Sequence, residues 1–172
     1  MSVTADNICT VRAGRPVQRV RWQTLPTCRP HIARPVAGDQ NAPMHIVRVF
    51  NGPDGRSHFE DLEVPESPHK NGSLTEKFPT TMAAFRHAPA AEPSAWKNSP
   101  RRQLVVCLWG TLEVTSGDGE KRIFNPGDVL LADDVDGQGH ISHDQVGPRR
   151  SIWIALPDDF DVSAWRIPPA DA

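Results

Sequence analysis

The stretch that decides the fold is residues 101–156, which read RRQLVVCLWGTLEVTSGDGEKRIFNPGDVLLADDVDGQGHISHDQVGPRRSIWIAL. Short runs of β-branched and large apolar residues are each closed by Gly, Asp, Asn or Pro, a pattern typical of strands joined by tight turns. Leu112 and Val114 alternate with polar neighbours, as in a half-buried strand, and no run has the period of a sizeable helix. The stretch therefore predicts a meander of antiparallel strands and an all-β fold.

The strand expected at residues 103–109 has two apolar sides. With the two-residue period of a strand, Gln103, Val105 and Cys107 point one way and the even-numbered residues 104–108 point the other. An antiparallel sheet with one face in water would instead alternate apolar and polar residues. We therefore expect the outer face to be covered by a second sheet, by an N-terminal hairpin or by another subunit. A two-fold pairing is the commonest oligomer, and we predict a homodimer.

Further strands are predicted before this stretch. Residues 44–50 and 57–64 form a hairpin around the Pro-Asp-Gly turn at 53–55, and residues 80–88 form another strand. Residues 64–79 have the composition of a loop. After Pro157, the sequence DVSAWRI at 161–167 predicts one helical turn that lays Trp165 against the wall of the domain.

Residues 1–43 differ in composition from the rest of the chain. They carry six Arg against Asp6 and Asp39 and have few large apolar residues, so we expect a disordered leader, or upstream codons before a true start at Met44. Residues 44–172 are predicted to form a single domain. Because the whole chain has a net charge of −2, the +4 of the leader leaves −6 on that domain. A domain this acidic repels phosphate backbones, so nucleic acid is not expected as a partner.

The cysteine content and hydropathy suggest a compartment. The three cysteines, Cys9, Cys28 and Cys107, are too few and too scattered for a disulfide framework or a zinc site. The sequence shows no recognisable secretory signal and no apolar run of about 20 residues, the length that spans a bilayer. We therefore expect a cytoplasmic protein without a membrane partner.

Two groups of residues within 95–156 are spaced as in known sequence motifs. Six residues separate Gln103 from Gly110, and Gly127-Asp128 opens a strand that is followed by the turn and histidine of Gly137-Gln138-Gly139-His140. These spacings resemble the two motifs of the cupins, a superfamily of small β-barrels. The resemblance implies a cupin-like jelly-roll (double-stranded β-helix) barrel over residues 44–172.

The resemblance also implies a metal site, but this sequence departs from its ligand set. Metal-binding cupins hold Fe, Mn, Ni or Zn through three histidines and a carboxylate. Here the segment 96–99 (WKNS) stands in place of two histidines and Gln103 in place of the glutamate, so only His140 remains. A protonated Lys97 has no lone pair to donate and repels a cation. We predict no tightly bound metal or other cofactor, with a divalent transition metal at His140 as the alternative.

The predicted ligand pocket combines polar groups with apolar walls and is formed by Gln103, His140, Ser142, Cys107, Val105 and Lys97. An ammonium and a neutral amide in place of metal ligands favour an anionic group, so we predict a small carboxylate or similarly polar ligand. A solid barrel, in which these polar groups bond one another, is the alternative.

The sequence does not decide whether the protein is an enzyme. The enzymatic alternatives are a metal-dependent, oxygenase-like cupin and a metal-free isomerase or epimerase with His140 as general base. Two charged runs are predicted to lie outside the pocket. The run Asp133-Asp134-Val135-Asp136 reads as a solvated acidic turn, and the Arg pairs at 101–102 and 149–150 read as exposed strand ends, one of which could instead reach an anionic ligand.

Overall fold

A computed structural model describes residues 43–167, and its regular elements there are strands and one short 3₁₀ helix. In chain order they are β1 (Met44–Asn51), β2 (Ser57–Val64), β3 (Glu66–His69), β4 (Gly72–Thr75), β5 (Met82–Ala88), β6 (Gln103–Thr115), β7 (Lys121–Phe124), β8 (Val129–Asp133), β9 (Ile141–Ala155) and η1 (Ser163–Trp165). The prediction of an all-β fold is confirmed. The predicted leader, apart from Pro43, lies outside the described residues, as do residues 168–172.

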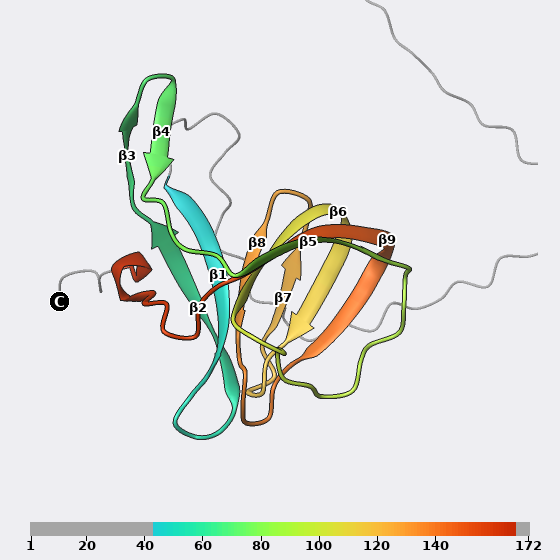
Figure 1. The fold of residues 1–172 in the computed structure, drawn as a ribbon. Coiled ribbons are helices and arrows are strands. Elements are labelled where there is room, and N and C mark those ends of the chain that lie inside the picture. Colours follow the sequence, from blue (N-terminus) through green and yellow to red (C-terminus); the bar gives the residue numbers. More distant parts are fainter. Residues whose placement is uncertain (1–42, 168–172) are drawn as a thin grey trace, which may run out of the picture.

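Seven of the strands form one sheet, in the hydrogen-bonded order β2-β1-β8-β6-β9-β5 with β7 paired to β6 (Figure 1). Within residues 101–156 the strands pair antiparallel, as predicted, but β7, β8 and β9 each pair with β6 and not with one another in chain order, so the predicted meander is wrong. The β1–β8 pair is parallel. The long strands β6 and β9, far apart in sequence, pair along most of their length. Among the described strands the order ends at β2 and β5, so hydrogen bonding does not close the sheet into a barrel.

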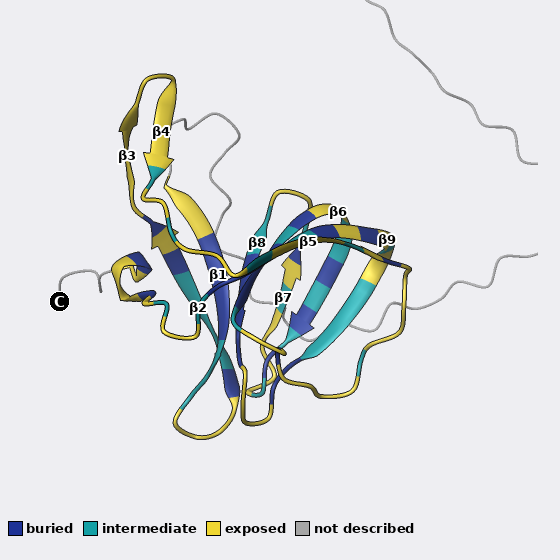
Figure 2. Cartoon of the chain, viewed as in Figure 1, coloured by how far each residue is buried: buried dark blue, intermediate teal, exposed yellow. Residues whose placement is uncertain are grey.

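Residues 64–79 were predicted to be a loop, and that prediction is wrong for most of the segment. The strands β3 and β4 pair as a separate hairpin with residues 70–71 between them. The hairpin projects away from the large sheet and is exposed over most of its length (Figures 1 and 2). Because neither strand buries a face, no apolar period marks them in the sequence.

The large sheet is apolar on both faces at β6, as predicted from residues 103–108. On the inner face Val105 and Cys107 pack with residues of β1, β7 and β8. On the outer face Leu104 packs with Leu131 and with Trp165 of η1, so the predicted position of Trp165 is confirmed. The segment that follows β9 thus covers part of the outer face.

A β-bulge in the middle of β6 keeps the inner face apolar along the whole strand. Cys107 and Leu112 both belong to the inner core, although an unbroken two-residue period would put them on opposite sides. The pairing with β9 shifts between Cys107 and Trp109 and again near Gly110, whose φ of +78° suits glycine. A Cβ on Gly110 would lie 2.5 Å from the carbonyl oxygen of Val146. This glycine therefore allows the close approach of β9.

No helix in the part of the chain from residue 43 to 167 has the length and apolar character needed to cross a membrane.

Candidate ligand-binding site

A cavity of about 150 Å³ lies on the inner face of the sheet, between β5, β6, β8, β9 and the segment 97–100. Its apolar wall comes from inward-facing strand residues, namely Val105, Leu112, Val114, Leu130, Ala132 and Trp153. Apart from Pro100, the remaining lining residues are polar or charged. This combination of apolar walls and a few polar groups is typical of a small-molecule site.

Five of the six residues predicted for the pocket line this cavity, which are Lys97, Gln103, Val105, His140 and Ser142. The sixth, Cys107, is not on the cavity wall. It shares the inner face with Val105 but is buried in the core, between strands rather than beside open space. Burial raises the pKa of the Cys107 thiol to about 11, so the side chain is a neutral core group at ordinary pH.

Lys97 and His140 are held next to each other by backbone hydrogen bonds. The Lys97 N–H donates to the His140 carbonyl at 3.0 Å, and the His140 N–H donates to the Lys97 carbonyl at 2.9 Å. The preceding residue, Gly139, has φ of +73°, and a Cβ there would lie 2.2 Å from the Lys97 carbonyl oxygen. Glycine at 139 is thus what lets the segment around Lys97 approach the strand that starts after His140.

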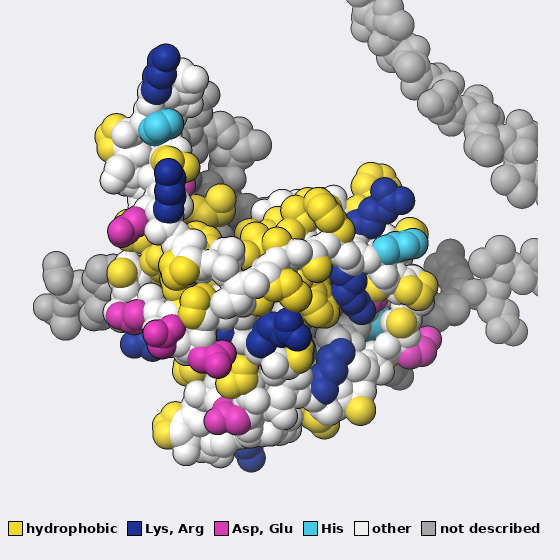
Figure 3. All heavy atoms as spheres, viewed as in Figure 1, with side chains coloured by type: hydrophobic (Ala, Val, Ile, Leu, Met, Phe, Trp, Pro, Cys, Tyr) yellow, Lys and Arg dark blue, Asp and Glu magenta, His cyan; other side chains and the backbone are white. Residues whose placement is uncertain are grey.

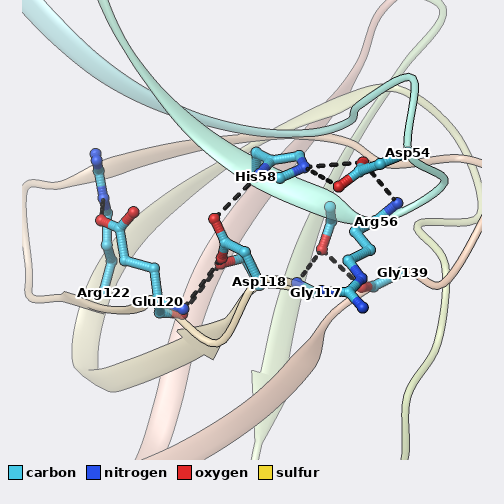
Figure 4. A network of polar contacts seen from close by, with 10 residues as sticks. Asp54, Arg56, His58, Gly117, Asp118, Glu120, Arg122 and Gly139 are labelled. Carbon is cyan, nitrogen blue, oxygen red and sulfur yellow. Dashed lines mark hydrogen bonds and ion pairs between the residues drawn. The ribbon is translucent and has the colours of Figure 1, made fainter.

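The turn that carries His140 is tied to two other turns at one end of the sheet (Figure 4). Ser57 Oγ donates to the Gly139 carbonyl at 2.7 Å and accepts from the Gly117 N–H at 2.8 Å. Next to it, His58 lies between Asp54 and Asp118, at 3.0 Å from each carboxylate. The hydrogen bond with Asp54 raises the pKa of His58, which therefore favours its charged form. These contacts fix the backbone from which His140 enters the cavity.

Inside the cavity the His140 ring is oriented by a buried carboxylate. The Asp134 Oδ2 atom lies 2.6 Å from His140 Nδ1, and Ser99 Oγ donates to Asp134 Oδ1 at 2.7 Å. Asp134 is 0% exposed, so the prediction that it belongs to a solvated acidic turn is wrong. A neutral imidazole that donates from Nδ1 to this carboxylate has its lone pair on Nε2.

Asp133 also departs from that prediction, because Arg48 and Arg102 both donate to its buried carboxylate. Composition alone could not show that Asp133 and Asp134 are buried and have hydrogen-bond partners. The signal that was available is position: Asp133 ends β8 and Asp134 follows it, directly after the buried apolar residues of that strand, where a polar side chain needs partners.

Gln103 presents an unpaired polar atom at the cavity. Its side chain is 3% exposed, and its Oε1 has no hydrogen-bond partner in the structure. Buried amide oxygens are nearly always paired, so an isolated one on a cavity wall is a feature that a ligand donor could satisfy. The prediction that Gln103 and His140 enter one lumen agrees with this geometry.

Three cationic side chains, Arg86, Lys97 and Arg149, line the cavity, and none of the described lining residues is Asp or Glu. Arg149 is 4% exposed and donates to Asp144 and to Ser151, so the prediction of an exposed strand end is wrong for this residue. The Arg86 guanidinium lies 5.1 Å from the centre of the Trp153 ring. Figure 3 shows Lys and Arg side chains gathered over the β5 and β9 side of the visible face, while Asp and Glu lie mainly over the β2 side.

The cations of the cavity repel one another. Burial, and after it the charge of Arg149, lowers the pKa of Arg86. Lys97 stands at the mouth, where partial burial of its ammonium and then the charge of Arg86 lower its pKa, while Asp144 acts in the opposite direction. A bound anion would relieve this repulsion and would favour the charged form of Lys97.

The residues of the cavity do not fit a metal ion. Within residues 43–167 no group of three or more His, Cys, Asp or Glu side chains could hold one. His140 would be the single imidazole donor among Lys97, Ser99 and Gln103, and its Nδ1 is engaged by Asp134. A shell of one imidazole beside three cations is unsuited to a divalent transition metal.

Comparisons with known proteins add little to this geometry. No family model matches the chain, and no curated protein matches it in sequence. Among solved structures, one neighbour is a protein provisionally named ethanolamine utilization protein Q from Salmonella typhimurium LT2, with TM-score 0.35 and 18% identity over 68% of this chain and 98% of that one. Another is a provisional mannose-6-phosphate isomerase from Ralstonia eutropha JMP134, with TM-score 0.28 and 19% identity over 73% of this chain and 95% of that one. At these TM-scores the likenesses carry no argument about function.

Proposed function

We propose that this chain is a cytoplasmic, cupin-type jelly-roll protein that binds a small carboxylate in its inner cavity without a tightly held metal. The observation that carries the proposal is the charge of the cavity, which has three cations and no acidic residue among its described lining residues. A carboxylate would accept hydrogen bonds from Arg86 and Lys97, and charge-assisted bonds of this kind are the strong ones.

Cavity size and the unpaired amide narrow the ligand further. A volume of about 150 Å³ is close to that of an engineered core cavity that holds benzene, so the ligand has roughly six to ten non-hydrogen atoms. Gln103 Oε1 needs a donor, which a hydroxyl group would supply. The ligand class that fits is a small hydroxycarboxylate, and a nucleotide is too large.

Calorimetric titration of the full chain with small hydroxycarboxylates and their neutral amides tests this proposal. We expect carboxylates to bind and the amides to bind at least tenfold more weakly. Arg86→Gln and Lys97→Gln should each weaken carboxylate binding about 10- to 100-fold, since a hydrogen bond to a charged group contributes about 1.5–3 kcal/mol. Arg101→Gln, which removes an exposed cation outside the cavity, is the matched control. Equal binding by all three variants, or binding of the amides as tightly as the acids, would refute the proposal.

A second candidate function is metal-free proton transfer, and the hydrogen bond between His140 and Asp134 favours it. With Nδ1 protonated, His140 Nε2 can take a proton from the carbon next to a bound carboxylate, while the C–H electron pair forms an enolate that the three cations stabilise. Returning the proton to the opposite face or to a neighbouring carbon completes an epimerisation or isomerisation with no net oxidation. NMR can follow the exchange of the ligand's α-hydrogen for deuterium in D₂O. Exchange with the parent chain that is lost in the His140→Gln variant would support this activity. Binding without exchange would leave the chain a binding protein.

A further inference from the structure

The outer face of the large sheet is covered at one end and bare at the other. Leu104 and Leu131 are covered by the segment that follows β9, which includes Trp165. Further along, where β5, β9 and β6 run side by side, no described element covers the face. We call this region the bare face, and its apolar residues are Ala83, Phe85, Val106, Leu108, Trp109 and Ile152.

Register places these side chains on the same side of the sheet. Phe85 is opposite Ile152, and Ile152 is opposite Val106, so the three form a row across β5, β9 and β6. Val106 alternates with Val105, which lines the cavity, so this row points away from the cavity. The bulge in β6 adds Leu108 and Trp109 on the outer side.

The exposed apolar area matches that of a protein interface. Phe85 is 85% exposed, Trp109 63% and Leu108 44%. With about 150–250 Å² for an aromatic side chain, the two rings expose roughly 300 Å². Leu108 and the half-buried Val106 and Ile152 bring the exposed apolar area of the patch to on the order of 500 Å². At about 25 cal/mol per Å², leaving this area in water has a substantial free-energy cost. A standard interface buries about 800 Å² per partner, of which about 65% is apolar in homodimers.

Charge favours a second copy over the N-terminal segment as the occupant. The charged or titratable groups exposed beside the patch are His87 and Arg150, in the row that contains Trp109. Residues 1–43 carry six Arg against two Asp and few large apolar residues, so this segment would add like charge and little apolar surface. A second copy brings an equal apolar patch.

Charge also selects the symmetry axis. An axis parallel to the strands would stack Arg150 on Arg150 of the other copy. An axis along the Phe85–Ile152–Val106 row reverses the strands, so that the row of His87 and Arg150 faces the row of Ala83 and Ile154 of the partner. In that arrangement the two Phe85 side chains meet.

We infer that the bare face is a two-fold interface between two copies of this chain, with Phe85 near the axis. The inference does not depend on the proposed ligand, because the interface and the cavity lie on opposite faces of the sheet. It specifies the surface by which the predicted homodimer would form.

Light scattering and oxidative crosslinking test the inference. The full chain should be a dimer at micromolar concentration, and Phe85→Asp should weaken association at least 100-fold, whereas Leu74→Asp, which alters an exposed residue of the β3–β4 hairpin, should not. In a Cys9→Ser, Cys28→Ser background, Phe85→Cys should form a disulfide-linked dimer and Arg150→Cys should not. A monomeric parent chain, or a dimer that survives Phe85→Asp, would overturn the inference. A monomer whose thermal midpoint falls with Phe85→Asp would instead indicate cover by a segment of the same chain.

Discussion

The inner and outer faces of the β5–β9–β6 region are built from alternate residues of the same strands, yet they are different surfaces. Arg86 lines the cavity, while its neighbour Phe85 is exposed on the bare face. Ser151 and Ile152 divide in the same way on β9. The inner face holds polar groups with buried partners around a small cavity, and the outer face offers apolar area without cover. A two-residue period thus lets one short edge strand contribute to a ligand site and to an interface.

The largest expected effect comes from breaking the bulge that assigns β6 residues to the two faces. Gly110→Ala combines an unfavourable positive φ with a 2.5 Å contact to the Val146 carbonyl oxygen, so we expect a loss of about 3–5 kcal/mol in the free energy of unfolding. Gly119→Ala is the matched control, because its φ is +89° but nothing lies near its Cβ, and about 1 kcal/mol should be lost there. Urea denaturation measures both. Similar losses in the two variants would show that β9 does not need this close approach.

The next effect tests the polar network of the inner face. Asp134→Ala leaves the His140 Nδ1–H and the Ser99 hydroxyl without their buried acceptor, and we expect a loss of about 2–4 kcal/mol in unfolding free energy. Asp136→Ala, two residues away and exposed, should cost less than about 1 kcal/mol. If the two alanine variants are equally stable, Asp134 is not the support for His140 that the geometry indicates.

A smaller effect is the pH dependence of ligand binding. Lys97 must be charged to hold an anion, so carboxylate affinity should be constant below the pKa of Lys97 and fall as pH rises through it. Because burial and Arg86 lower that pKa, the fall should begin at a lower pH than for an ordinary lysine. Titrations from pH 7 upward should show this fall in the parent chain and not in Lys97→Gln. Ionisation of Cys107 does not interfere below its pKa of about 11.

The sequence predicted most of what depends on local pattern. The strands at 44–50, 57–64 and 80–88, the two apolar sides of residues 103–108 and the position of Trp165 follow from periods and turn residues. Five cavity residues were found because the cupin resemblance placed Gln103 and His140 in one lumen. The resemblance could not place Cys107, which shares a strand face with Gln103 but lies beyond the end of the cavity.

What the sequence did not predict depends on contacts between distant segments. Asp134 is recognisable as a buried partner of His140 only once the fold brings His140 and Ser99 to it. Arg149 was predicted to be an exposed strand end because the long pairing of β6 with β9 has no local signal in the sequence. That pairing places Arg149 in a buried position. The parallel β1–β8 pair is equally non-local, and exposed β3 and β4 carry no hydrophobic period.

A crystal structure of the full chain soaked with a small hydroxycarboxylate that binds in calorimetry tests the central claim most directly. The account predicts the ligand inside the cavity, its carboxylate within hydrogen-bond distance of Arg86 and Lys97, and its hydroxyl donating to Gln103 Oε1. A ligand bound elsewhere on the chain, or a cavity closed by its own side chains, would contradict it.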